Sequence, residues 1–165
     1  NYKECIVRKN KVFWGLSALC LSMPITASSA DNLLLEANSK LALSYSPYRL
    51  AEVETTDSKS VFGQIMAGTP GQTIAVADKL VLKDVLDSFH QMCGYKPSQV
   101  TGINVVSHDY PEFYEVWEFD DNDSHMDNGK SALSLVLKAL PNNGGTDIDI
   151  YGDCHPKPLS FTNLK

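Results

Sequence analysis

The sequence predicts an α+β domain: an antiparallel β-sheet, built as a meander of hairpins, with one main amphipathic helix packed on one face and a disulfide joining the two. Three observations lead to this fold class. One segment repeats apolar side chains at three- and four-residue spacing, which indicates a helix, and several later segments alternate with a period of two residues. In addition, two cysteines lie beyond Ala30 and form a natural pair.

The segment 1–30 has the three parts of a secretory signal peptide. Basic side chains come first, an apolar run from Val12 to Ile25 follows, and small residues lead to Ala30. The run is shorter than the ~20 residues that cross a bilayer. We therefore expect residues 1–30 to be cleaved and residues 31–165 to form a single periplasmic or secreted domain without membrane insertion. Cys20 leaves lipid attachment open as an alternative, although Leu19 is larger than the residue that usually precedes a lipidated cysteine.

The charge of the chain narrows the choice of partners. The total is −6, and the segment 1–30 contributes +3, so the predicted mature domain carries −9. An acidic surface repels phosphate backbones and anionic lipids, which argues against nucleic-acid and membrane-surface functions. A basic protein is the partner class that this charge favours.

The cysteine count predicts one disulfide. Cys5 and Cys20 fall within the predicted signal peptide, which leaves Cys93 and Cys154. In a compartment that oxidises thiols, such a pair forms a disulfide. Closing a loop of about 60 residues would stabilise the fold by roughly 3–4 kcal/mol through the entropy of the unfolded chain.

The clearest helix is predicted over Val81–Cys93, and Gly94 supplies a left-handed stop. Its apolar stripe consists of Leu82, Val85, Leu86, Phe89, Met92 and Cys93. Upstream, residues 32–45 fit a helix or a strand equally well, and residues 53–60 are predicted as a polar connector. Residues 61–78 resemble a hairpin with its bend at residues 69–71.

Strands dominate the rest of the chain. Segments 101–108 and 112–119 are rich in β-branched and aromatic residues, while 131–140 and 146–153 alternate apolar and polar side chains. Two turn-rich connectors join the last three of these segments, which predicts an antiparallel meander of three strands. The helix ends at Cys93 and Cys154 follows the last strand, so we expect the disulfide to pin the helix to the sheet.

An acidic segment lies between the second and third of these strands and is predicted to be a hairpin loop. It contains Asp120, Asp121, Asp123, His125 and Asp127. An EF-hand starting at Asp121 would place His125 and Met126 where an oxygen ligand and a glycine are needed. We therefore predict a solvated loop without metal or cofactor, with a looser calcium cage as the alternative. Replacing its four aspartates with asparagine should leave thermal stability nearly unchanged.

The strand before this loop carries large side chains on both faces. Phe113, Trp117 and Phe119 share one face, and Tyr114 and Val116 share the other. One face is expected to be core, and the second lies either beneath other elements or in an exposed aromatic patch. Such a patch beside an acidic loop would suit a protein partner, so Tyr114 and Trp117 join the loop residues as candidate binding residues.

Nothing in the sequence forms a diagnostic catalytic motif. No Gly-x-Ser-x-Gly, HExxH or Cys-x-x-Cys occurs, and Glu115 and Glu118 are expected on opposite faces of their strand. The sequence thus favours an exported, non-catalytic protein-binding domain, such as an inhibitor or immunity protein directed against a basic enzyme or toxin. The alternatives are a small exported hydrolase with a dispersed Ser/His/Asp or carboxylate site, and an accessory protein of the envelope or a secretion apparatus.

Overall fold

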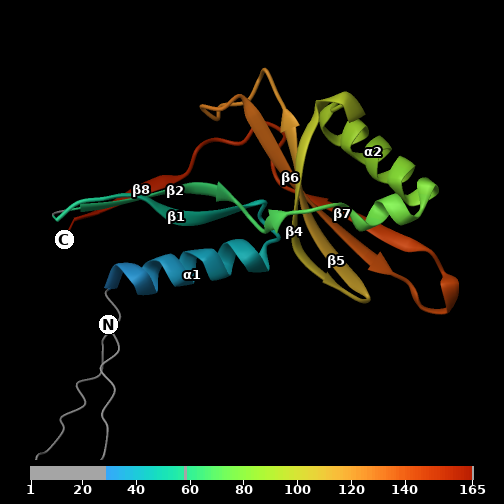
Figure 1. Ribbon diagram of the computed structural model, residues 1–165, viewed down its shortest axis with the longest axis horizontal. Helices are drawn as coiled ribbons and strands as arrows, with labels where there is room; N and C mark the ends of the chain where they lie inside the picture. Colours follow the sequence, from blue (N-terminus) through green and yellow to red (C-terminus); the bar gives the residue numbers. More distant parts are fainter. Residues whose placement is uncertain (1–28, 58, 165) are drawn as a thin grey trace, which may run out of the picture.

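The computed structural model describes residues 29–57 and 59–164 and has an α+β fold with two antiparallel sheets (Figure 1). Their strand orders are β1-β2-β8 and β3-β4-β5-β6-β7. The α+β class and the hairpin-built sheets are confirmed, although the strands form two sheets and not one. Residues 1–28, which include most of the predicted signal peptide and Cys20, lie outside the described residues, so both statements about them stay predictions.

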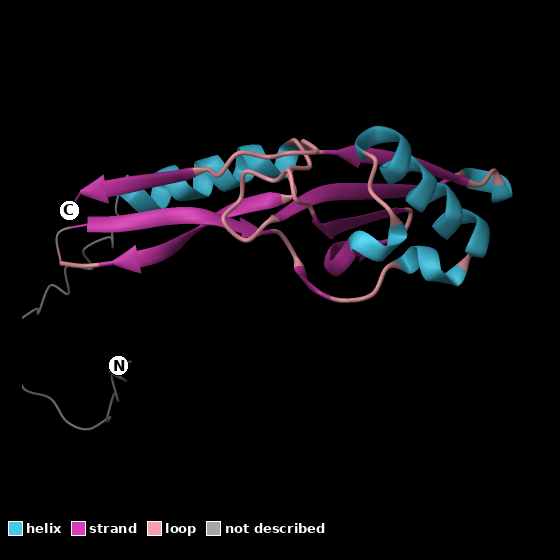
Figure 2. Ribbon diagram, turned by 90° about the horizontal axis from the view of Figure 1, so that it is seen from above, coloured by secondary structure: helices cyan, strands magenta, loops and turns pink. Residues whose placement is uncertain are grey.

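The first sheet contains β1 (Tyr48–Thr55), β2 (Lys59–Met66) and β8 (Ser160–Leu164), and helix α1 (Ser29–Leu43) runs alongside it (Figure 2). The Asn38 side chain of α1 donates to the Leu50 carbonyl at 2.9 Å and accepts from the Leu50 N–H at 2.7 Å. A neighbouring strand would form the same two bonds. Helix α1 therefore covers the edge of β1 at this point, where an added strand would otherwise pair.

Two upstream predictions are wrong. Strand β1 extends to Thr55 and pairs with β2 as far as Ser60, so residues 53–60 are mostly hairpin and not a connector. Residues 61–78 do not form a hairpin, because β2 pairs with β1 and β8 while β3 (Thr69–Pro70) pairs with β4. Between them Gly68 has φ 80°, and a Cβ there would lie 2.5 Å from a backbone oxygen of β4. The chain thus leaves the first sheet and joins the second.

The second sheet confirms the predicted three-strand meander and adds β4 before it. Strands β4 (Val100–Asp109), β5 (Glu112–Asp120), β6 (Lys130–Ala139) and β7 (Thr146–Tyr151) pair in chain order, and each is antiparallel to the next. Short 3₁₀ helices η1 (Ile74–Ala77), η2 (Pro97–Gln99) and η3 (Pro141–Asn143) occupy three of the connections.

Helix α2 (Lys79–Cys93) covers one face of this sheet. It starts two residues before the predicted position because the Asp78 side chain accepts hydrogen bonds from the N–H groups of Leu80 and Val81. It ends as predicted at Gly94, which has φ 75°. Val85 and Phe89 are buried against the sheet, but Met92 is 45% exposed. Met92 is rotated about 100° from the inward-facing Cys93, so it belongs to the rim and not to the core.

Both faces of the second sheet are buried. The α2 face holds Trp117, Phe119 and three leucines of β6, and the opposite face holds Tyr114, Val116 and Val136 beneath the chain that links the two sheets. The sulfur atoms of Cys93 and Cys154 are 1.98 Å apart, which confirms the predicted disulfide between the end of α2 and the segment after β7.

Among the described residues, no helix combines the length and apolar character needed to span a lipid bilayer.

Candidate functional site

The acidic segment forms the loop between β5 and β6, as predicted, and it protrudes beside the second sheet (Figure 1). Its backbone is closed on itself: Asp121 N–H donates to the Gly129 carbonyl at 3.0 Å, and Gly129 N–H donates to the Met126 carbonyl at 3.0 Å. The Ser124 hydroxyl donates to the Lys130 carbonyl at 2.6 Å. These bonds fix the path of the loop between its two strands.

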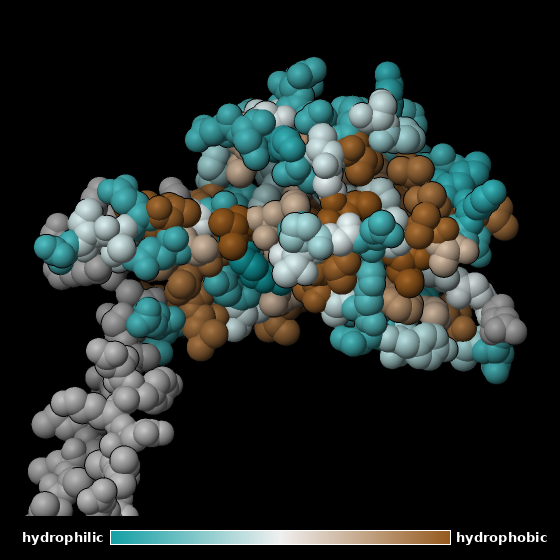
Figure 3. Space-filling view, in the orientation of Figure 1, coloured by the Kyte–Doolittle hydropathy of each residue, from teal (hydrophilic) through white to brown (hydrophobic). Residues whose placement is uncertain are grey.

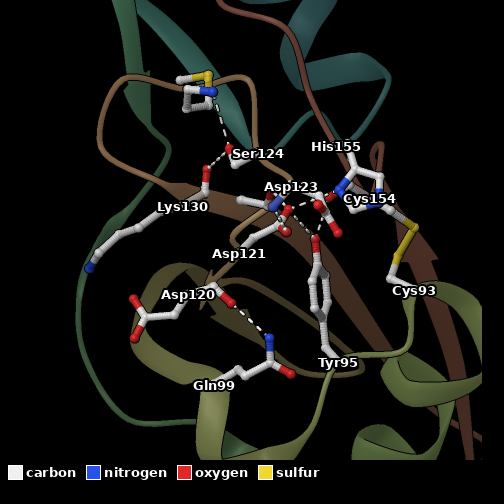
Figure 4. A network of polar contacts seen from close by, with 12 residues as sticks. Cys93, Tyr95, Gln99, Asp120, Asp121, Asp123, Ser124, Lys130, Cys154 and His155 are labelled. Atoms are coloured by element: carbon white, nitrogen blue, oxygen red, sulfur yellow. Dashed lines mark hydrogen bonds and ion pairs between the residues drawn. A yellow bond between two sulfur atoms is a disulfide. The ribbon is translucent and has the colours of Figure 1, made fainter.

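Asp121 holds the loop from inside. Its side chain is only 5% exposed and lies among the labelled residues at the centre of Figure 4. Oδ1 accepts from the Asp123 N–H at 2.9 Å, while Oδ2 accepts from the Ser131 hydroxyl at 2.6 Å and pairs with His155 Nδ1 at 3.0 Å. The Tyr95 hydroxyl lies 3.1 Å from the same Oδ2. This carboxylate therefore connects the loop, β6, the segment after α2 and the segment after β7.

The surroundings of Asp121 favour its ionised form. Burial raises the pKa of this carboxyl, but the hydrogen bonds from Ser131, Asp123, His155 and Tyr95 together outweigh burial and bring the pKa below its ordinary value. Burial raises the pKa of the Tyr95 hydroxyl to about 12, so Tyr95 keeps its proton and acts as a donor. The network is thus built around a buried negative charge.

The network is attached to the disulfide. Tyr95 follows Cys93 by two residues, and its hydroxyl directs its single proton at the Cys154 carbonyl as well as at Asp121, while His155 is the residue after Cys154. Sequence reasoning did not find Tyr95, Ser131 or His155 as members of the site. The available signal was that a Cys93–Cys154 bond must bring the neighbours of both cysteines together.

The predicted site residues divide into three groups. Asp120, Asp123, His125 and Asp127 are exposed, as expected for a solvated loop, and the space-filling view is largely hydrophilic where this loop rises (Figure 3). Asp121 is buried, which corrects the expectation that all four aspartates are solvated. Tyr114 and Trp117 are 6% and 2% exposed and lie in opposite cores. Neither aromatic side chain is available to anchor a partner at the surface.

A cavity of about 420 Å³ lies beside His155, between the first sheet and the segment after β7, and includes Tyr48 and Gln64 in its lining. A histidine oriented by a buried carboxylate is the arrangement that general-base catalysis uses. The Ser131 hydroxyl, however, donates to Asp121 and is buried, so it is not placed to be activated by His155. Ser44 and Ser46 also line this cavity, but the Ser44 hydroxyl donates to the Leu41 carbonyl and the Ser46 hydroxyl accepts from the Tyr48 N–H. The hydrolase alternative therefore has an oriented base, but within the described part of the chain no hydrogen bond joins that base to a serine hydroxyl.

The second histidine that pairs with a carboxylate, His108, belongs to a network that holds secondary-structure elements together. Glu115 is completely buried and accepts hydrogen bonds from Ile74 N–H at 2.7 Å and Trp117 Nε1 at 3.0 Å, and it pairs with His108 Nε2 at 2.9 Å. These contacts tie η1 and β4 to β5. Glu118 lies on the opposite face of β5, as predicted, so the two glutamates do not converge.

Within residues 29–57 and 59–164, no three His, Cys, Asp or Glu side chains come together in a group that could hold a metal ion. None of the family models, curated proteins or solved structures compared with this chain matches it.

The contrast between Asp121 and its exposed neighbours gives a testable prediction. Asp121→Asn should lower the free energy of unfolding by about 1–3 kcal/mol, because the amide group would turn N–H groups towards buried donors. The exposed Asp123→Asn is the matched control and should change it by less than about 0.5 kcal/mol. Urea unfolding at neutral pH measures both.

The Asp121 carboxylate should also make the free energy of unfolding depend on pH in the acidic range. Because its pKa is lowered on folding, ionised Asp121 contributes stability above its unfolded pKa of about 3.9. That contribution should disappear as the pH falls through the lower folded pKa, and the Asp121→Asn variant should lack this component. Parallel pH–stability curves for the wild type and the variant would contradict the role given to Asp121.

Proposed function

We propose that the protein is an exported, non-catalytic binding protein that uses the β5–β6 loop to bind a basic protein, such as an enzyme or toxin that it inhibits. The disulfide and the signal-like segment 1–30 support export to an oxidising compartment. Binding is favoured over catalysis because no hydrogen bond among the described residues joins the oriented His155 to a serine hydroxyl, although Ser44 and Ser46 line the same cavity.

The proposal rests on one observation: hydrogen bonds hold the β5–β6 loop, and with it the acidic side chains, in a fixed position. Buried Asp121 fixes the loop from inside, whereas Asp120, Asp123 and Asp127 are exposed to solvent on a path set by hydrogen bonds. A loop that is ordered before binding loses little conformational entropy when a partner docks. Acidic side chains that only kept the protein in solution would not need such support.

The charge of the chain supports the same partner class. With a net charge of −6, the protein attracts basic surfaces over long range, and the loop concentrates that attraction at a protruding point. Exposed charges of this kind raise the association rate more than they raise the affinity. The proposed interaction should therefore be fast and sensitive to salt.

The test is stopped-flow association with a panel of basic secreted enzymes, beginning with lysozyme and ribonuclease. At least one should bind with a rate that falls steeply with salt. A variant with Asp120→Asn, Asp123→Asn and Asp127→Asn should associate about tenfold more slowly while keeping its thermal stability, because Asp121 is retained.

The matched control replaces Asp84, Asp109 and Asp147 with asparagine. It removes the same charge from exposed positions away from the loop and should slow association much less. Equal slowing in the two triple variants would assign the effect to net charge and contradict the role of the loop. A calcium-dependent rise in melting temperature that is lost only in the loop variant would replace the protein partner with a metal ion.

A further inference from the structure

A second cavity, of about 290 Å³, lies beneath the acidic loop where the loop faces the first sheet. Its apolar wall includes Met66 from β2 and Met126 from the loop. Its polar side contains Glu118 and Lys130, which come from the two strands that the loop connects. The cavity is therefore apolar on one side and charged on the other.

The described neighbours of Glu118 engage only one of its two carboxylate oxygens. Its Oε2 atom accepts from the Lys130 ammonium at 2.6 Å and from the Thr101 hydroxyl at 2.7 Å. Within the described residues, no hydrogen bond engages its Oε1 atom. The side chain is 22% exposed, so a solute can reach this carboxylate.

The charge around the cavity favours a cation. Lys130 is the cavity's own positive charge and is already paired with Glu118. Asp120 lies directly opposite Lys130 in the β5–β6 register, and Asp127 stands between two loop residues that line the cavity, Met126 and Asn128. A further positive group entering here would meet an acceptor oxygen and an acidic rim.

We propose that this cavity receives a lysine or arginine side chain of the partner. The aliphatic part of that side chain packs against Met66 and Met126, and its charged end binds Glu118 Oε1. Long basic side chains have this combination of an apolar stem and a charged head. The inference rests on the proposed function for the identity of the partner, and it adds a specific anchor point to the loop's diffuse charge.

The probe is n-butylguanidinium, with the neutral n-butylurea as the control ligand, and the readout is the NMR signal of the methionine methyl groups. The guanidinium should shift the Met66 and Met126 signals saturably, whereas the Met92 signal on the far helix should not move. Butylurea at equal concentration should leave all three unchanged.

Two variants that break the same ion pair should have opposite effects. Glu118→Gln should weaken butylguanidinium binding about threefold to fivefold, and Lys130→Met should strengthen it, because the competing ammonium is gone. If the Glu118–Lys130 ion pair only supported the fold, both variants would change the affinity for butylguanidinium in the same direction. Glu112→Gln is the matched control, since Glu112 also pairs across β5 and β6, with Lys138 at 3.7 Å, and it should bind like the wild type.

The absence of saturable shifts in both the wild type and Lys130→Met would overturn the inference, as would equal shifts with butylurea. Partner association that is slowed by the loop substitutions but unchanged by Glu118→Gln would overturn it and leave the proposed function in place. Saturable butylguanidinium binding without any basic protein partner would support the cavity site and reject the proposed function.

Discussion

Replacing Phe89 with alanine should lower the free energy of unfolding by about 3–5 kcal/mol. Phe89 is 1% exposed, and its ring lies 5.0 Å from that of Phe119 and 5.3 Å from that of Trp117, centre to centre. The substitution removes a fully buried contact between α2 and the second sheet and leaves a cavity beside these two rings. Chemical denaturation of the purified protein measures the change.

Leu80→Ala is the matched control on the same helix. Leu80 is 71% exposed, so its truncation should alter the free energy of unfolding by less than about 0.5 kcal/mol. Leu86, which packs beside the core from the turn before Phe89, should give an intermediate loss of about 2 kcal/mol or more. Losses of similar small size at all three positions would mean that α2 does not pack on the sheet through this face.

Reduction of the Cys93–Cys154 bond should have the second large effect. The two cysteines are 61 residues apart in the sequence, and loss of the bond returns loop entropy to the unfolded chain worth about 4 kcal/mol. The melting temperature should fall by roughly 10–20 °C when reductant is added. Because Tyr95 and His155 adjoin the two cysteines, reduction should also loosen their hold on Asp121.

A double Cys93→Ala, Cys154→Ala variant separates the bond from side effects of the reductant. It should melt at the temperature of the reduced wild type and should not respond to reductant. If full reduction, verified by thiol titration, left the melting temperature of the wild type unchanged, the stabilising role of the disulfide would be contradicted.

The sequence by itself determined the features that depend on short-range pattern. The apolar spacing of α2, its glycine stop and the period-two strands that follow each record the geometry of one element, and neighbouring strands joined by short turns pair with each other. The cysteine count determined the disulfide, because only one pair remains beyond Ala30. The acidic loop was predictable for the same reason as the strands around it.

Only the tertiary structure decided what each face and each polar group meets. Residues 32–43 became part of a helix in which Asn38 completes the edge of β1, and residues 61–78 were divided between two sheets by pairings with distant strands. Asp121 resembles Asp120 and Asp123 in the sequence. It became the buried centre of the site because Tyr95, Ser131 and His155, up to 34 residues away along the chain, bring their hydrogen-bonding groups to it. Such long-range contacts cannot be predicted from the periodicity of the sequence, since each depends on how distant segments are arranged in the folded chain.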